Sequence, residues 1–280
     1  MIVDAHQHFW DPARGDYGWL KPDNPIHRVI STADLRPLLV QTGVDATILV
    51  QAAPTPAETD YMLDIARNTP WVLGVVGWID LEASDAPDEV RRRAGDPLFL
   101  GVRPMLQDLS DPNWILNAAL APALNTIAAE GLVFDALILP HQLAVITELA
   151  GRHSQISIVL DHAAKPPLGD ADGMAAWART IEKLAALPNV TCKVSGLLTE
   201  VRPGGGKDDV ARCIGMLFDL FGPQRLLWGS DWPVLTLAGG YQDWFELARE
   251  AVAAKDSSAV RAVMGDNAVR IYRPSRHNHA

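Results

Sequence analysis

The chain has 280 residues, 48% of them hydrophobic, which is enough apolar surface for a large core in one or two domains. Its 34 acidic and 24 basic residues give a net charge of −10, which argues against a nucleic-acid-binding surface and against attraction to an anionic membrane. No apolar run approaches the length of a membrane span, and Asp4 and His6 interrupt any N-terminal signal peptide, so we expect a cytoplasmic protein. The two cysteines, Cys192 and Cys213, fit a reducing compartment.

Short hydrophobic runs alternate along the chain with amphipathic stretches, the pattern of βα units around a parallel sheet. Helix signals include Thr55–Glu58, with a cap residue, a proline in the first turn and an early carboxylate. Strands are expected at about residues 2–8, 46–51, 72–79, 100–105, 133–139, 156–163, 190–196 and 226–231. Eight such units predict a single α/β domain, a (β/α)8 TIM barrel over residues 1–273, with a C-terminal tail at 274–280.

The first expected strand ends in the segment VDAHQHFW, which carries two imidazoles. Alternate residues of a strand point to the same side, so His6 and His8 share a face, with Asp4 behind them. Two neighbouring imidazoles suit either a metal ion or a polarised carbonyl group. Histidines also occur as hydrogen-bonded core residues, so the pair gains a functional meaning only together with the other strand ends.

Polar or aromatic side chains occur at or just beyond the end of every expected strand. In a TIM barrel these ends form one mouth, where the reacting groups lie. Buried singly in the core, such polar groups would each cost several kcal/mol unless paired. We therefore expect one shared site that includes His6, His8, Trp10, Gln51, Trp78, Arg103, His141, His162, Lys193, Asp231 and Trp232.

Several of these residues have a plain structural alternative. Arg103 could form a salt bridge at the barrel mouth, and Lys193 could form a buried ion pair. His141 follows Pro140 and could begin the next helix instead. The tryptophans could pack in the core rather than stack on a ligand.

Five motifs, in order along the chain, resemble the amidohydrolase superfamily: VDAHQHFW, VLDHAAKPP, CKVSGL, LLWGSDWPV and GDNAVRIY. The resemblance covers about residues 1–273, and within the superfamily the chain is most similar to the branch of sugar and aromatic lactonases. The opening HFWDPARGDYGWL and the Lys21 that follows look most like enzymes that hydrolyse lactones of deoxy-sugar acids, such as L-fuconolactone. The resemblance therefore implies an enzyme that hydrolyses a small sugar lactone.

Carried over residue by residue, the superfamily pattern implies metal-binding or carbonyl-binding histidines at His6 and His8. It implies a further histidine at His162 and the water-activating aspartate at Asp231. Two-metal members bridge their ions with a fourth-strand lysine or glutamate, where this chain has Arg103, a cation that would repel a second ion. The resemblance thus implies at most one divalent ion, zinc, on His6, His8 and Asp231, in a branch that also includes members without a metal.

For lactone hydrolysis we expect Asp231 to take the proton of the attacking water, while His6 and His8 with Arg103 polarise the carbonyl group. His162 or His141 would protonate the departing oxygen. The other candidates would bind the sugar, namely Trp10, Gln51, Trp78, His141, Lys193 and Trp232. The sequence leaves the ring size of the lactone, the sugar stereochemistry and the oligomeric state open.

Two other functions fit part of the pattern. A zinc-dependent decarboxylase or lactonase acting on an aromatic-derived acid would share the His-x-His pair and the final aspartate, although the tryptophans favour a sugar ring. A barrel that only binds a sugar acid would need no base, and Asp231 argues against it.

Overall fold

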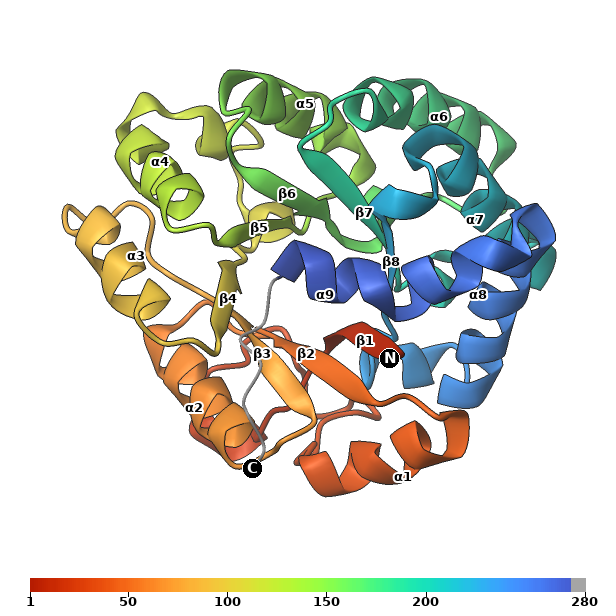
Figure 1. Ribbon diagram of the computed structural model, residues 1–280, viewed down its shortest axis with the longest axis horizontal. Coiled ribbons are helices and arrows are strands. Elements are labelled where there is room, and N and C mark those ends of the chain that lie inside the picture. Colours follow the sequence, from red (N-terminus) through yellow and green to blue (C-terminus); the bar gives the residue numbers. More distant parts are fainter. Residues whose placement is uncertain (273–280) are drawn as a thin grey trace.

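The computed structural model describes residues 1–272, which form a ring of eight parallel strands surrounded by helices (Figure 1). The expected (β/α)8 barrel is confirmed for these residues, and the tail expected at 274–280 lies outside them. The strands are hydrogen-bonded in sequence order. They are β1 Val3–Gln7, β2 Ala46–Val50, β3 Val72–Gly77, β4 Phe99–Val102, β5 Val133–Ala136, β6 Ser157–Leu160, β7 Val190–Val194 and β8 Leu226–Trp228.

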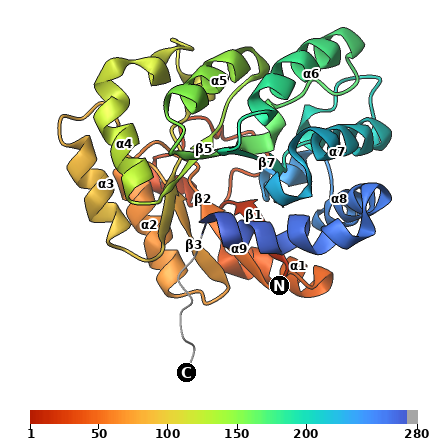
Figure 2. The ribbon, with the colours of Figure 1, turned by 45° about the horizontal axis from the view of Figure 1, so that its top comes forward.

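A helix follows each strand and packs on the outside of the ring, as a view turned by 45° also shows (Figure 2). The predicted helix start at Thr55 is confirmed, since the Thr55 side chain caps the helix and Pro56 is its first residue. The helices are α1 Thr32–Thr42, α2 Pro56–Arg67, α3 Ala86–Ala94, α4 Ala121–Ala129, α5 Leu143–Arg152, α6 Ala171–Ala185, α7 Lys207–Phe221, α8 Tyr241–Lys255 and α9 Asn267–Tyr272.

The ring closes between β1 and β8 at the carboxyl end of the strands. Asp231 N donates to His6 O at 2.7 Å, and His8 N donates to Trp232 O at 2.8 Å. A bridge between Gln7 and Trp232 lies between these two bonds. Because of this pairing, the residues that follow the first and the last strands lie side by side, although some 220 positions separate them.

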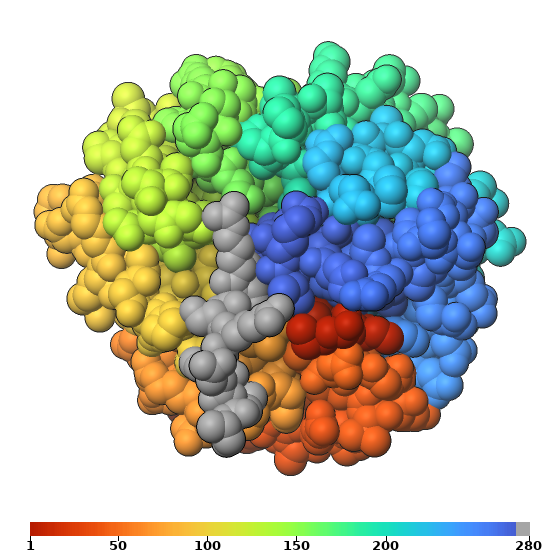
Figure 3. Space-filling model, viewed as in Figure 1, coloured from red at the N-terminus to blue at the C-terminus, as the bar shows by residue number. Residues whose placement is uncertain are grey.

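The interior of the barrel is a core of small and branched side chains, as close-packed parallel strands require. Helix α9 adds Ala268, Ile271 and Tyr272 to this core. In Figure 1 it crosses the centre of the ring, and Figure 3 shows the C-terminal helices directly beside the N-terminal residues on this face. The barrel is therefore closed at its amino end, and the opposite end remains for a ligand.

The strands end earlier than expected, because the residues after them leave the extended conformation. His162, Ala163, Ala164 and Lys165 all have left-handed backbone angles, with φ between 50° and 57°, and Asp231 has φ 59°. Such angles are uncommon for residues with a side chain and cluster at functional sites. The turns after β6 and β8 thus aim His162 and Asp231 in directions that a continued strand would not allow.

Within residues 1–272, no helix is both long enough and apolar enough to cross a lipid bilayer.

Candidate active site

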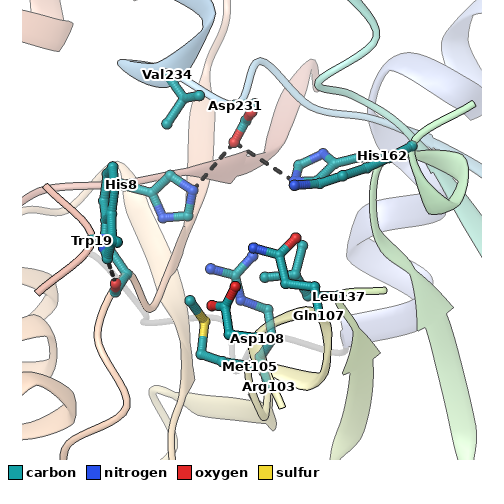
Figure 4. Close-up of a pocket in the computed structure, with 12 residues that line it drawn as sticks. His8, Trp19, Arg103, Met105, Gln107, Asp108, Leu137, His162, Asp231 and Val234 are labelled. Atoms are coloured by element: carbon teal, nitrogen blue, oxygen red, sulfur yellow. Dashed lines mark hydrogen bonds and ion pairs between the residues drawn. The ribbon is translucent and has the colours of Figure 1, made fainter. Parts of the chain in front are cut away.

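A cavity of about 230 Å³ opens at the carboxyl ends of the strands. Figure 4 shows His8, His162 and Asp231 pointing toward one another on one side of it, with Arg103 on the other side. His6 is fully buried behind them. The residues that line the cavity are His8, Trp19, Ala52, Arg103, Met105, Gln107, Asp108, Leu137, His162, Lys165, Asp231 and Val234.

The two histidines of the first strand face each other, as their alternate positions predict. Their Nε2 atoms lie 3.2 Å apart. His8 Nδ1 lies 2.7 Å from Val50 O, and because a carbonyl oxygen only accepts, this nitrogen carries the proton. The lone pair of neutral His8 therefore lies on Nε2, which faces the cavity.

Asp231 is the residue on which three imidazoles converge. Its Oδ1 atom lies 3.3 Å from His8 Nε2, 3.6 Å from His6 Nε2 and 3.8 Å from His162 Nε2. Burial alone would raise the pKa of this carboxyl, but the surrounding imidazoles hold the pKa well below its usual value. Asp231 is consequently ionised at neutral pH and able to accept a proton.

His162 completes the group and is positioned by the seventh strand. Its Nδ1 atom lies 2.9 Å from Ser195 Oγ. A Cβ atom at Gly196 would lie 2.6 Å from the same Nδ1, so only glycine leaves room for the ring. Burial lowers the pKa of His162 to about 4, and this imidazole is therefore neutral at neutral pH.

Arg103 is held in place by Gln51, which follows β2, and by the buried acid Asp161. Its Nη1 atom lies 3.2 Å from Asp161 Oδ2 and 3.3 Å from His6 Nε2. Its Nη2 atom donates to the backbone oxygen of Gln51, whose side chain in turn donates to Arg103 O at 2.8 Å. Arg103 Nε is buried without a partner among the described residues, so the guanidinium retains a free donor.

Lys193 lies inside the barrel rather than in the cavity. It is fully buried, with Nζ 2.5 Å from Asp135 Oδ2 and 3.0 Å from Asp161 Oδ1. Burial opposes ionisation of Asp161, but Lys193, His6 and Arg103 keep its pKa well below the usual value. This is the buried ion pair that the sequence left as an alternative, and it differs from the expected contact with substrate.

The geometry of His6, His8 and Asp231 fits one divalent metal ion. The three donor atoms lie 3.2, 3.3 and 3.6 Å from one another. Ligands bonded to tetrahedral zinc at about 2.0–2.1 Å stand about 3.3–3.4 Å apart. His6 Nδ1 lies 3.1 Å from Lys193 Nζ and 3.4 Å from Asp161 Oδ1. A metal ion on His6 Nε2 requires that the proton of neutral His6 lies on Nδ1, the atom beside the Asp161 carboxylate.

Five of the expected substrate-binding residues lie behind or beside the cavity. Gln51 is hydrogen-bonded to Arg103, and Lys193 lies against His6. Trp10 is fully buried and donates to Ile26 O and Arg28 O, and buried Trp232 packs against the Phe9 ring. His141 is exposed in the turn Pro140–Gln142 that leads into α5, so it begins the next helix. None of these five side chains lines the cavity, and their contact with a sugar stays a prediction from the sequence.

Trp78 lines a second cavity that borders the first. Other residues that line the cavity were not among those expected from the sequence: Trp19, Met105, Gln107, Asp108 and Lys165. Met105 ended an expected strand and Lys165 followed one, but neither was singled out, whereas Trp19, Gln107 and Asp108 lie beyond the expected strand ends. The buried acid Asp135 could have been recognised from the sequence, because it is a charged residue within a hydrophobic strand, as Lys193 is.

A family model described as Amidohydrolase matches residues 3–273, nearly the whole chain. The protein belongs to the amidohydrolase family. Among curated relatives of this amidohydrolase, the L-fucono-1,5-lactonase of Burkholderia ambifaria is 44% identical, over 99% of this chain and 98% of the relative. The L-fucono-1,5-lactonase of Burkholderia multivorans is 36% identical, over 97% of this chain and 96% of the relative.

Among solved structures, an amidohydrolase from Burkholderia multivorans with bound zinc is similar over nearly all of both chains. The TM-score is 0.92, with 34% sequence identity, 98% of this chain covered and 99% of the other. The family resemblance expected from the motifs is thus confirmed, and the described His/Asp cluster of this amidohydrolase is able to hold a metal ion.

Proposed function

We propose that this amidohydrolase hydrolyses the lactone of a deoxy-sugar acid, L-fucono-1,5-lactone or a related aldonolactone, to the free sugar acid. The observation that carries the proposal is the 44% identity to an L-fucono-1,5-lactonase over practically the whole of both chains. The site supports it, because it combines an ionised carboxylate with neutral imidazoles and a buried cation, the groups that ester hydrolysis needs.

In the proposed reaction, Asp231 accepts a proton from water as the water oxygen attacks the lactone carbonyl carbon. Arg103 stabilises the negative charge that develops on the carbonyl oxygen, with the free donor at Nε or a terminal nitrogen. His6 and His8 lie beside the same carboxylate, and because His8 Nε2 carries a lone pair, this imidazole would act on the carbonyl group through a bound ion rather than by donating a hydrogen bond. A divalent ion such as zinc, held by His6, His8 and Asp231, would supply Lewis-acid polarisation of that group.

When the ring ester bond breaks, its oxygen leaves as an alkoxide and needs a proton. His141 lies outside the cavity, and His162 is neutral at neutral pH. We therefore assign the return of the proton to Asp231, which has just received one, with His162 orienting its carboxylate. Lactone and water are consumed, and a hydroxy acid is formed.

The test follows proton release from L-fucono-1,5-lactone with a pH indicator, beside carbon dioxide release from aromatic acids. We expect turnover of the lactone and none of the aromatic acids. Asp231→Asn should lower kcat by about a thousandfold, while Asp111→Asn, an exposed aspartate outside the cavity, should retain it. Carbon dioxide release without lactone turnover would instead support a decarboxylase. An unchanged kcat in Asp231→Asn would show that Asp231 is not the general base.

A further inference from the structure

A second cavity of about 530 Å³ borders the catalytic cavity and has more than twice its volume. The two cavities share Trp19, Met105 and Asp108 as lining residues. Figure 4 shows these three side chains together with His8 and Arg103 around the catalytic cavity. A ligand that reaches past Trp19 and Met105 would therefore extend from the catalytic site into this second cavity, which we call the outer groove.

The outer groove is lined by three tryptophans: Trp19, Trp78 and Trp114. Trp19 is fixed in place, because its Nε1 donates to Ala52 O at 2.7 Å. The ring of buried Trp10 meets it edge to face, with centroids 5.4 Å apart. Trp10 thus supports a rigid aromatic surface that is 39% exposed, which is a preorganised platform for the apolar face of a ring.

The groove also leaves apolar surface in contact with water. Within residues 1–272, six large hydrophobic side chains are exposed, and two of them, Trp19 and Leu109, line this groove. Contiguous exposed apolar surface rimmed by polar residues is typical of binding sites. The concentration of such surface beside the catalytic cavity favours a ligand there.

The polar residues of the groove are acidic. Asp80, Glu82 and Asp108 line it, and none of them forms a salt bridge with a basic side chain of the described chain. Asp16, also in the lining, is paired with Arg14 at 2.8 Å. Carboxylates accept hydrogen bonds from hydroxyl groups and repel anions. Aromatic faces beside hydroxyl-binding carboxylates therefore suit a neutral sugar and disfavour an anionic one.

We propose that the outer groove is a subsite for a neutral sugar unit attached to the lactone, so that the enzyme hydrolyses glycosylated aldonolactones. This inference rests on the proposed lactonase function. Water adds to the lactone carbonyl carbon and the ring ester bond breaks, while the glycosidic bond stays intact. The product is a glycosylated aldonic acid, with its sugar unit still against the tryptophans.

The test compares kcat/KM for L-fucono-1,5-lactone with kcat/KM for the three derivatives that carry a β-D-glucosyl group at O2, O3 or O4. We expect at least one derivative to be hydrolysed within about tenfold of the unsubstituted lactone. Hydrolysis of none of the three would overturn the subsite. An enzyme inactive on the unsubstituted lactone as well would contradict the proposed function, a separate outcome.

Two variants locate the sugar unit in the groove. Trp114→Ala and Leu109→Ser should each lower the ratio of kcat/KM for the glucosylated over the unsubstituted lactone, by about tenfold for the tryptophan. Val40→Ser removes a more exposed apolar side chain on α1, outside both cavities, and should leave the ratio as it is. Unchanged ratios in both groove variants would overturn the proposal.

Discussion

Lys193 Nζ lies 3.1 Å from His6 Nδ1, inside the barrel and behind the catalytic cavity. The ammonium group lies within hydrogen-bond distance of His6 and Asp135, and it forms an ion pair with Asp161 Oδ1 at 3.0 Å. Tyr272 on α9 donates to Asp135 at 2.8 Å. The helix that closes the amino end of the barrel is therefore linked through two side chains to the histidine at the other end.

Replacing the buried ammonium group should damage both stability and catalysis. Lys193→Met leaves Asp135 and Asp161 buried without their shared cation, and we expect a loss of about 3–5 kcal/mol in the free energy of unfolding. The kcat should also fall, because His6 loses a hydrogen-bond partner. Urea denaturation and steady-state kinetics measure the two effects. Lys255→Met, which removes an exposed pair with Asp219, should cost less than about 1 kcal/mol, and equal losses in the two variants would contradict the network.

Gly196 should be intolerant of any side chain. Its φ of 62° is left-handed, and a Cβ atom would lie 2.6 Å from His162 Nδ1. We expect Gly196→Ala to displace His162, to lower kcat by about ten- to a hundredfold, and to destabilise the fold by about 1–2 kcal/mol.

Gly215→Ala serves as the control, because its Cβ would meet only the Lys255 side chain at 3.6 Å and lies within α7. This change should stabilise the protein by up to about 1 kcal/mol with kcat unaltered. A Gly196→Ala enzyme with wild-type kcat would show that the ring of His162 is not confined as described.

Glu58 should make the free energy of unfolding depend on pH between 4.5 and about 7. Its carboxylate accepts hydrogen bonds from Ala52 N and Ala53 N in the loop after β2, and burial raises its pKa from 4.5 to about 7. The folded protein thus binds more protons than the unfolded chain between these two values. The contribution of Glu58 to stability is complete below pH 4.5 and is lost as the pH rises through about 7.

The measurement is the difference in unfolding free energy between wild type and Glu58→Gln, determined by urea denaturation across this range. We expect the difference to fall, as pH rises, by up to about 3 kcal/mol. Glu130→Gln, at an exposed helix end, controls for the removal of a negative charge. If the difference in unfolding free energy rose with pH, the pKa of Glu58 would be lowered in the folded protein rather than raised.

One divalent ion should bind to the protein after treatment with a chelator. Titration of the treated protein with zinc should show one site and should raise the Tm, since the ion binds the folded state. His8→Gln removes one of the three donors and should abolish both effects, whereas His153→Gln, far from the cavity, should preserve them. Identical zinc binding in the two variants would place the ion elsewhere.

Much of the fold and part of the site could be predicted from the sequence, because both depend on local patterns. The hydrophobic runs predicted the eight strands. Because side chains alternate along a strand, the first strand was expected to carry His6 and His8 on one face. The side chains that hold other residues were harder to recognise. Lys193 and Gln51 are polar at a strand end, as a ligand-binding residue would be, and only their partners show that they lie behind the cavity.

The sequence by itself determined that His6, His8, His162 and Asp231 belong to one mouth of a barrel, since parallel strands carry their carboxyl ends to the same side. The tertiary structure decided which side chains reach the cavity. Left-handed turns at His162 and Asp231 and the pairing of β1 with β8 bring three imidazoles to one carboxylate oxygen. Loops set Trp19 and Lys165 on the wall, because their direction depends on contacts far away in the chain, such as Trp19 with Ala52.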